Sequence, residues 1–483
     1  MVREIQRTKP RPNGAKPSTH AHLLLAHRYG TPEMGKIWGA EQTFEYSLGV
    51  QGQSAMTLSR LHPDVVPPEH AEEIHEKATL KHVSAQKVRE IEEKTGHDVI
   101  AFNSALQEVL SPEAATHVNK FKTSADSTEN AKALQLKQSL EVIIESVENL
   151  RDVVLERAKH DWRDVPHQDV SHWYDAVPAT AGRPFVFYAE MLQSDLDFLK
   201  QVHAKSIVGK WADATGNHHS AHSAGVDGVV LQEQFCQDIG VSHMEAPAQI
   251  PGREYISDVV YAMTRTGGTI KALADYIRWG RSDDVALFKF PLKKKGSSAM
   301  PHKTAKGGNP SGEEQAGSFF SYAKGVLTTS VDTIPFAYAR DLTGSSSDRI
   351  TLEGIFKFGD HTIRRMAGIV DKLILDEDRS VERVDRTYGC TTSQRVMTYL
   401  TDHRRVENPM TRDEAHTLCA DLATEAYMTK VDFFDLCNAH PDITSRIRPE
   451  VLSNLTDARQ YTGESRRIID RVYAKCHGKK TLE

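Results

Sequence analysis

The strongest constraint on the fold is a set of long apolar seams with helical spacing. Between residues 136 and 154, apolar side chains recur at alternating steps of four and three, with charged residues between them. This spacing places one apolar stripe on a long helix that needs helical partners. Similar seams follow at 185–199, 256–277 (interrupted by Gly267-Gly268), 312–331 and 355–375. Several such helices and little strand-like alternation predict an all-α fold organised around a bundle of long helices.

Prolines and changes of pattern divide the chain into three expected parts. Residues 1–112 contain shorter helical pieces, broken at several prolines and at Gly96. Residues 113–370 carry the long seams, and residues 371–483 carry shorter helices, including one predicted over Thr411–Met428. These parts are an N-terminal helical domain, a central helical bundle and a C-terminal helical cap domain. The opening 1–19, basic and without an apolar core, is expected to be a disordered tail rather than a signal peptide.

Composition excludes several classes of partner. A formal net charge of −6 and a pI near 6.5 argue against nucleic-acid binding. No stretch approaches ~18 consecutive apolar residues, so no membrane span is expected. The five cysteines are scattered and lack CxxC spacing, which favours a cytoplasmic protein without disulfides. His218, His219 and His222 lack acidic or cysteine partners at ligand spacing, so we expect no metal.

The stretch 296–303, with the sequence GSSAMPHK, interrupts the helical pattern and carries most of the candidate chemistry. Glycines and prolines in and after it prevent a helix from running through. The hydroxyls of Ser297 and Ser298 offer a group that can take a proton, and Lys303 and Asn309 offer donors for a developing oxyanion. By chemistry alone, a polar linker with incidental serines explains the stretch equally well.

This stretch, followed by Asn-Pro and a glutamate, resembles the signature loop of the fumarase/aspartase superfamily of helical lyases. Its AMPHK form is most similar to the adenylosuccinate lyase family and to carboxymuconate-cycloisomerase relatives. The resemblance implies a three-part all-α fold, no cofactor, and a homotetramer whose active sites are shared between subunits. One departure is the five residues 304–308 between Lys303 and Asn309, where the family has one. Either the inserted glycines loop out and leave Asn309 in place, or Lys306 takes over a contact.

Two histidines stand in motifs of their own. His97 lies beside Asp98 after a glycine, where it can be held in one tautomer and act as a donor or acid; a helix-capping Asp with a surface His is the alternative. The HDVxAF sequence resembles the first histidine motif of adenylosuccinate lyases, which implies a substrate contact. His172, after Ser171, is expected to open the next long helix. It resembles the family histidine that protonates the departing nitrogen, with Trp173 in place of the usual glycine.

Residues 123–126, Thr-Ser-Ala-Asp, are expected to start a long helix, where a hydroxyl caps free N–H groups and an anion is favoured. Capping alone explains the pattern. The motif also resembles the TSxD element of the family, which implies that Thr123, Ser124 and Asp126 contact the substrate. The family has a histidine four residues earlier, where this chain has Asn119. Either Asn119 substitutes as a donor, or a neighbouring lysine, Lys120 or Lys122, contacts the phosphate.

An anion cradle is predicted near residue 345. Arg340 and Arg349, with serines such as Ser345 between them, suit phosphate recognition, although a solvated salt-bridging loop has the same composition. The stretch resembles the RDxxxSSxxR element of adenylosuccinate lyases, which implies contacts to a nucleotide. Further positions with family counterparts are Arg28, Tyr29, Gln249, Arg253, Gly209 and Lys210.

Taken together, the resemblance implies β-elimination of fumarate from adenylosuccinate, giving AMP, and from the succinyl-aminoimidazole-carboxamide ribotide of purine synthesis. Ser297 is the expected base with Ser298 beside it, Lys303 and Asn309 hold the carboxylate, and His172 is the acid, assisted by His97. The serine loop and His172 are expected to converge on one substrate once subunits assemble. A carboxymuconate-cycloisomerase-like or other succinyl-group lyase, and a non-catalytic helical scaffold, are the alternative readings.

Overall fold

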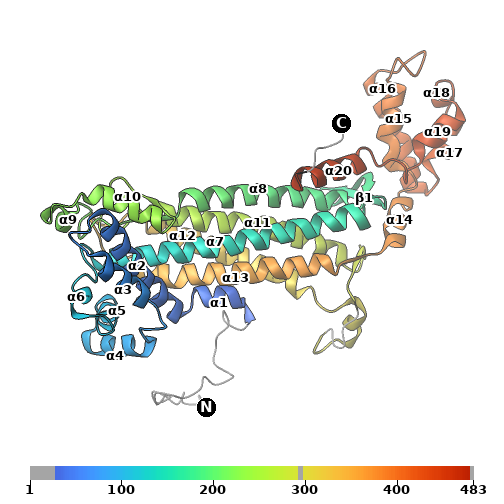
Figure 1. Ribbon diagram of the computed structural model, residues 1–483. Coiled ribbons are helices and arrows are strands. Elements are labelled where there is room, and N and C mark those ends of the chain that lie inside the picture. Colours follow the sequence, from blue (N-terminus) through green and yellow to red (C-terminus); the bar gives the residue numbers. More distant parts are fainter. Residues whose placement is uncertain (1–27, 292–296, 479–483) are drawn as a thin grey trace.

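A computed structural model describes residues 28–291 and 297–478 of the chain (Figure 1). The predicted tail 1–19 lies outside these residues. Five long helices run side by side as the central bundle, one for each seam of the sequence. They are α7 (Ser124–Glu156), α8 (Arg183–Lys205), α11 (Glu254–Arg281), α12 (Ser311–Asp332) and α13 (Ser345–Asp371). The all-α prediction is confirmed. None of the helices in the described ranges is long and apolar enough to cross a bilayer.

The seams form the core of the bundle. On α7 the side chains from Leu136 to Val154 that define the seam are at most 5% exposed, and on α8 those from Phe185 to Leu199 are fully buried. Each buried CH₂ contributes about 0.8 kcal/mol through the hydrophobic effect. Burial of the seams therefore stabilises the long helices and holds them against one another.

Gly267 and Gly268 do not break α11, in contrast to the interruption expected there. A Cβ added at Gly267 would lie 3.0 Å from the Phe319 ring of α12. The helix continues because tertiary packing outweighs the cost of glycine, about 1 kcal/mol per residue. The missing side chain allows α11 and α12 to approach closely.

A second core lies at one end of the bundle, at the left in Figure 1. Leu48, Phe102 and Phe235 are among its buried side chains. It combines segments from both sides of residue 112, because α9 and α10 pack with the N-terminal helices. The helices of this region are α1 (Pro32–Ile37), which lies along the bundle, α2 (Ala40–Leu61), α3 (Pro68–Lys77), α4 (Ala85–Thr95), α5 (Asp98–Gln107), α6 (Pro112–Ala115), α9 (His219–Ser223) and α10 (Gly228–Asp238).

A third core lies beyond the other end of the bundle. Its helices are α14 (Glu377–Asp385), which leads into it, α15 (Ser393–Leu400), α16 (Arg412–Thr429), α17 (Phe433–Ala439), α18 (Pro441–Thr444) and α19 (Pro449–Thr456). Helix α16 confirms the helix predicted over 411–428, and Thr411 and Glu414 form a capping box at its start. The last helix, α20 (Ser465–Cys476), returns to the bundle, where Ile469 is fully buried. The final helix is thus packed on the bundle rather than in the third core.

Three short two-stranded sheets complete the described chain. They are the antiparallel pair β1 (Pro166–Ser171) and β2 (Tyr174–Thr180), the parallel pair β3 (Val208–Gly209) and β4 (Ser242–His243), and the antiparallel pair β5 (Phe288–Lys289) and β6 (Ile374–Leu375). The first pair overturns one expectation, because His172 lies in a hairpin turn and α8 begins only at Arg183. His172 and Trp173 both have positive φ, 52° and 66°, as a two-residue type I′ turn requires.

Candidate active site

The predicted site residues fall into two groups, one at each end of helix α11, so the length of α11 gives the distance between the groups. Arg253 immediately precedes the helix and Arg281 is its last residue, so its 28 residues span about 40 Å. One group lies at the N-terminal end of α11: His97, Thr123, Ser124, Asp126, Gln249, Arg340, Ser345 and Arg349. The other lies at the C-terminal end: Ser171, His172, Ser297, Ser298, Lys303 and Asn309.

Part of the N-terminal group lines a cavity of about 550 Å³ between α2, α5, α7 and the start of α13. Arg340, Ser345 and Arg349 line it together, so the structure brings the predicted anion cradle into one wall. Arg340 Nη1 donates to Gln249 Oε1 at 3.0 Å. Arg349 lies 3.7 Å from the carboxylate of Asp98, across the cavity. Both guanidinium groups thus have a neighbour that orients them.

His97 stands at the start of α5, beside this cavity. Its Nδ1 accepts from the backbone N–H of Ile100 at 3.5 Å and lies 3.4 Å from Asp98 Oδ1. The side chain is 43% exposed. The capping arrangement weighed from the sequence is present, and the imidazole also remains accessible to a ligand.

Four charged side chains form a buried cluster behind the cradle. Lys132 Nζ lies 3.3 Å from Glu129 and 3.2 Å from Asp348, while Arg253 lies 2.9 Å from Glu129 and 3.5 Å from Asp348. Burial alone would raise the pKa of Glu129, but the charges of Lys132 and Arg253 outweigh it and lower that pKa to about 2. Asp348 lies in the first turn of α13 between Ser345 and Arg349, so the cluster fixes the turn that carries the cradle.

Sequence reasoning missed most of this cluster. Only Arg253 carried a signal, through its family counterpart. Glu129 and Lys132 are three residues apart, the spacing of many ion pairs on helix surfaces, so the sequence alone does not mark them. Asp348 comes from a segment more than 200 residues further along the chain.

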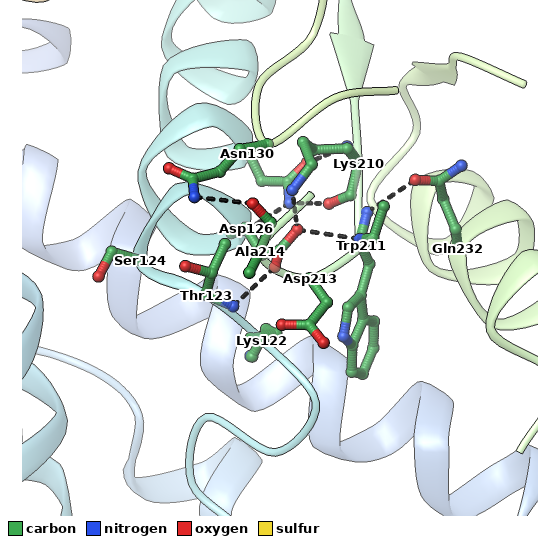
Figure 2. A network of polar contacts seen from close by, with 12 residues as sticks. Lys122, Thr123, Ser124, Asp126, Asn130, Lys210, Trp211, Asp213, Ala214 and Gln232 are labelled. Carbon is green, nitrogen blue, oxygen red and sulfur yellow. Dashed lines mark hydrogen bonds and ion pairs between the residues drawn. The ribbon is translucent and has the colours of Figure 1, made fainter. Parts of the chain in front are cut away.

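Asp126 lies in a buried network that ties the start of α7 to the turn at residue 210 (Figure 2). Its Oδ2 accepts from Thr123 N at 2.8 Å and its Oδ1 from Ala212 N at 3.0 Å. Lys210 Nζ forms an ion pair with the same carboxylate, and both side chains are fully buried. Lys210 N also donates to Asn130 Oδ1 at 2.9 Å. Asp126 therefore has no surface that faces the cavity, whereas Thr123 and Ser124 are partly exposed.

Asn119, at the position where the family has a histidine, is hydrogen-bonded to α2. Asn119 exchanges two hydrogen bonds with Gln51, at 3.2 and 3.3 Å. Lys122 Nζ donates to Gln51 Oε1 at 2.6 Å and also to Ser54 Oγ. Burial lowers the pKa of Lys122 to about 7, opposed by the nearby Asp126. Both side chains brace the chain before α7, and neither lines the 550 Å³ cavity.

At the other end, the signature loop folds back on itself. A 3₁₀ turn, η3 (Pro301–Lys306), is followed by Gly307 and Gly308 with φ of 74° and 86°. Lys303 Nζ donates to Asn309 Oδ1 at 3.0 Å. Asn309 therefore lies beside Lys303 despite the five residues between them. The alternative expectation, a contact from Lys306, falls on a side chain outside the described part of the chain, as does Gly296.

This loop borders a cationic cavity of about 530 Å³, and a buried ion pair holds its base. Arg278, Arg281 and Lys303 are among the cavity's lining residues. Arg281 Nη1 pairs with Glu313, its Nη2 donates to Gly308 O at 3.0 Å, and both side chains of the pair are under 10% exposed. The cavity therefore offers several positive charges to an anion, at the loop that carries Lys303. Sequence reasoning gave no role to either Arg281 or Glu313.

The two serines of the loop have different surroundings. Ser297 Oγ accepts from the backbone N–H groups of Ala299 and Met300, at 3.3 and 3.1 Å. The side chain of Ser298 is exposed. Two donors aimed at Ser297 Oγ would stabilise negative charge on that atom.

His172 lines a separate cavity of about 400 Å³, with Asp169, Trp173 and Tyr276. Burial raises the pKa of Asp169. Trp173 is 64% exposed on the hairpin turn, and Ser171 pairs with Tyr174 across it. Ser297 is not among the residues that line this cavity, although both residues lie at the same end of the bundle.

Tyr29 and its neighbour Arg28 lie elsewhere. The Tyr29 ring packs against Phe358 and His361, with ring centroids 5.5 and 5.8 Å apart. These residues are about 15 Å along α13 from Arg349. The structure does not bring Arg28 and Tyr29 to the cradle of the same chain.

No metal cluster is found in the ranges that the structure describes: no group of three or more His, Cys, Asp or Glu side chains there could hold an ion.

Comparison with known proteins places this geometry in a family. The family described as lyase matches residues 27–316, and the family described as adenylosuccinate lyase C-terminus matches residues 389–472. The adenylosuccinate lyase of Methanocaldococcus jannaschii is 28% identical over 472 residues, covering 97% of this chain and 98% of that protein. The adenylosuccinate lyase of Bacillus subtilis is 29% identical over 450 residues, covering 93% and 99%.

Solved structures agree on the fold. A fumarate lyase from Mesorhizobium sp. BNC1 superposes with a TM-score of 0.79 at 18% identity, covering 92% of this chain and 98% of that one. A 3-carboxy-cis,cis-muconate lactonizing enzyme from Pseudomonas putida has a TM-score of 0.79 at 20% identity, covering 94% and 99%. The helical bundle, the signature loop and the two full-length relatives converge: the chain belongs to the lyase family of the fumarase/aspartase superfamily, in its adenylosuccinate lyase branch.

Proposed function

We propose that this lyase eliminates fumarate from adenylosuccinate, giving AMP, and from the succinyl-aminoimidazole-carboxamide ribotide of purine nucleotide synthesis. The observation that carries the proposal is the pairing of Lys303 with Asn309 beside a cationic cavity. The substrate has a dicarboxylate at one end and a phosphate at the other. The signature-loop cavity suits the first, and the Arg340, Ser345 and Arg349 cradle suits the second.

The elimination removes a proton from the carbon next to a carboxylate and breaks a C–N bond. Ser297 is the proposed base, because two backbone N–H groups would stabilise its alkoxide. Lys303 and Asn309 hold the carboxylate while it carries the extra charge. His172 gives a proton to the departing nitrogen, with His97 assisting at the substrate.

The remaining predicted contacts divide by their accessibility. Thr123, Ser124, Gln249 and Ser171 stay in the proposed substrate site as partly exposed hydroxyls and an amide. Asp126 is not part of the proposed substrate site, because its carboxylate is buried against Lys210. We propose that Asp126 holds the start of α7. Arg28 and Tyr29 reach the substrate only from a different subunit.

Assembly follows from the 40 Å between the two groups. One substrate cannot touch both groups of a single chain, so we propose a cytoplasmic homotetramer in which different subunits supply the cradle, His172 and the serine loop. We propose three domains, 1–112, 113–370 and 371–483, with the candidate residues at both ends of the central bundle.

The proposal is tested by mixing purified protein with adenylosuccinate and following fumarate release. Wild type is expected to turn over, and His172→Gln is expected to lose on the order of 10²-fold or more in kcat. Absence of fumarate from the wild type would reject the lyase activity. Fumarate release by His172→Gln at the wild-type rate would reject only the role of the imidazole.

Subunit sharing has its own test. Neither His172→Gln nor Arg349→Leu is expected to be active alone, since each lacks one group at every site. When the two are coexpressed or refolded together, some sites combine an intact His172 with an intact Arg349, and activity returns. Mixtures as inactive as the parents would contradict a shared site.

A further inference from the structure

The hairpin turn that carries His172 is held from α14 and α11 by side chains without any assigned part in the reaction. Trp173, the other central residue of the turn, packs its ring on Trp279 of α11, with centroids 5.4 Å apart. The guanidinium of Arg383, on α14, lies over the Trp279 ring at 5.5 Å. Trp279 is thus in contact with the turn on one side and with a cation on another.

Arg383 also reaches the hairpin directly. Its Nη2 donates to Asp175 Oδ1 at 3.2 Å, and Arg386 Nη2 donates to Asp175 Oδ2 at 3.0 Å. Asp175 lies on β2, three residues from His172. Arg383 is only 3% exposed, although an arginine is rarely buried unless it is paired. A buried guanidinium that bridges a carboxylate and an indole has little freedom to move.

The base of the same hairpin is attached to the same helix. Ser380, one turn before Arg383 on α14, donates through Oγ to Pro166 O at 2.8 Å, where β1 begins. Helix α14 therefore contacts the hairpin near its base and near its tip. A two-stranded hairpin is marginally stable by itself, so these contacts decide how far its turn can move.

Resting on the proposed role of His172, we propose that Arg383 and Trp279 are positioning residues that fix the His172 turn. Neither touches the reacting atoms. They act through Trp173 and Asp175, which follow His172 by one and three residues on the same hairpin. Because a displacement of about 1 Å can cost on the order of 10²-fold in rate, a loosened turn would lower kcat without weakening the substrate contacts made elsewhere.

The test uses Trp279→Leu and Arg383→Met in the full-length protein, with Trp279→Phe as the conservative variant. Arg395→Met is the matched control, because the Arg395 guanidinium lies over Tyr461 at 5.3 Å in the C-terminal region, away from the hairpin. The first two variants are expected to lose on the order of 10- to 100-fold in kcat with KM within about threefold of wild type. Trp279→Phe is expected to keep most of the wild-type kcat, and the kcat of Arg395→Met is expected to stay within about twofold of wild type.

Hydrogen exchange of residues 166–180 supplies a readout independent of turnover. We expect faster exchange confined to this segment in Trp279→Leu and Arg383→Met, and wild-type exchange in Arg395→Met. If both variants exchange like wild type, or if their loss appears in KM alone, the positioning role is rejected. If both fail to fold by circular dichroism, the contacts hold the scaffold and the proposal is also rejected. A wild type without turnover rejects the proposed function, while the exchange data still decide whether the contacts restrain the turn.

Discussion

Lys303 donates to Asn309 at 3.0 Å although five residues separate them. A 3₁₀ turn and two glycines with positive φ return the chain and bring the two side chains together. The amide and the ammonium can therefore act on one carboxylate together.

Asn309→Ala is expected to lower kcat on the order of 10²-fold, because an amide donor to the developing oxyanion is removed and Lys303 loses its acceptor. Fumarate release under saturating substrate measures the effect. Asn438→Ala, at an exposed position on α17, is the matched control and should match wild type. An Asn309→Ala enzyme with wild-type kcat would show that Lys303 acts without this partner.

Ser297→Ala is expected to lose on the order of 10³-fold or more in kcat, because it removes the hydroxyl whose oxygen accepts from two backbone N–H groups. Ser298→Ala is the comparison at the neighbouring hydroxyl and should retain most activity. Single-turnover measurements separate the chemical step from product release. The reverse ranking of the two variants would move the base to Ser298.

Acid is expected to destabilise the protein through Glu129. Its pKa is about 2 in the fold, below the ordinary value of 4.5, so its contribution is complete above about pH 4.5 and is lost as the pH falls toward 2. The shift corresponds to about 3 kcal/mol of unfolding free energy. Urea unfolding at pH 7, 4.5 and 3 measures it, and Glu129→Gln should flatten this part of the profile. Glu93→Gln, at an exposed position, should leave the profile as in wild type.

Lys210→Met is expected to destabilise the fold by about 3–5 kcal/mol, because Asp126 is left buried without its cation. Asp126→Asn combined with Lys210→Met should cost less than the sum of the single changes, since the pair is removed as a unit. Unfolding at a fixed protein concentration gives the comparison. Strictly additive effects would mean that the two side chains do not depend on each other.

The bundle could be predicted from the sequence because the spacing of apolar residues along one helix depends only on neighbouring positions in the chain. The seam on α7 could be found from six apolar residues and their spacing. The hairpin at His172 was missed because its turn lacks the glycine or asparagine that signals positive φ, and the neighbouring Pro-Ala-Thr pattern suggested a helix start.

Contacts between distant segments explain the other misses. Asp126 read as a substrate ligand because its partner, Lys210, lies 84 residues away, and only the fold shows that the pair is buried. The cluster behind the cradle likewise joins α7, α11 and α13. The order of motifs along a chain also says nothing about which end of a 40 Å bundle each one reaches.

The buried Arg281 and Glu313 pair has a consequence for how this enzyme can diverge. It joins the last turn of α11 to the first turn of α12, so the two helices meet at a fixed point whatever length of chain runs between them. Residues can be gained or lost in that span without shifting the helices against each other. The length of this segment can then vary among related enzymes while α11 and α12 keep their relative position.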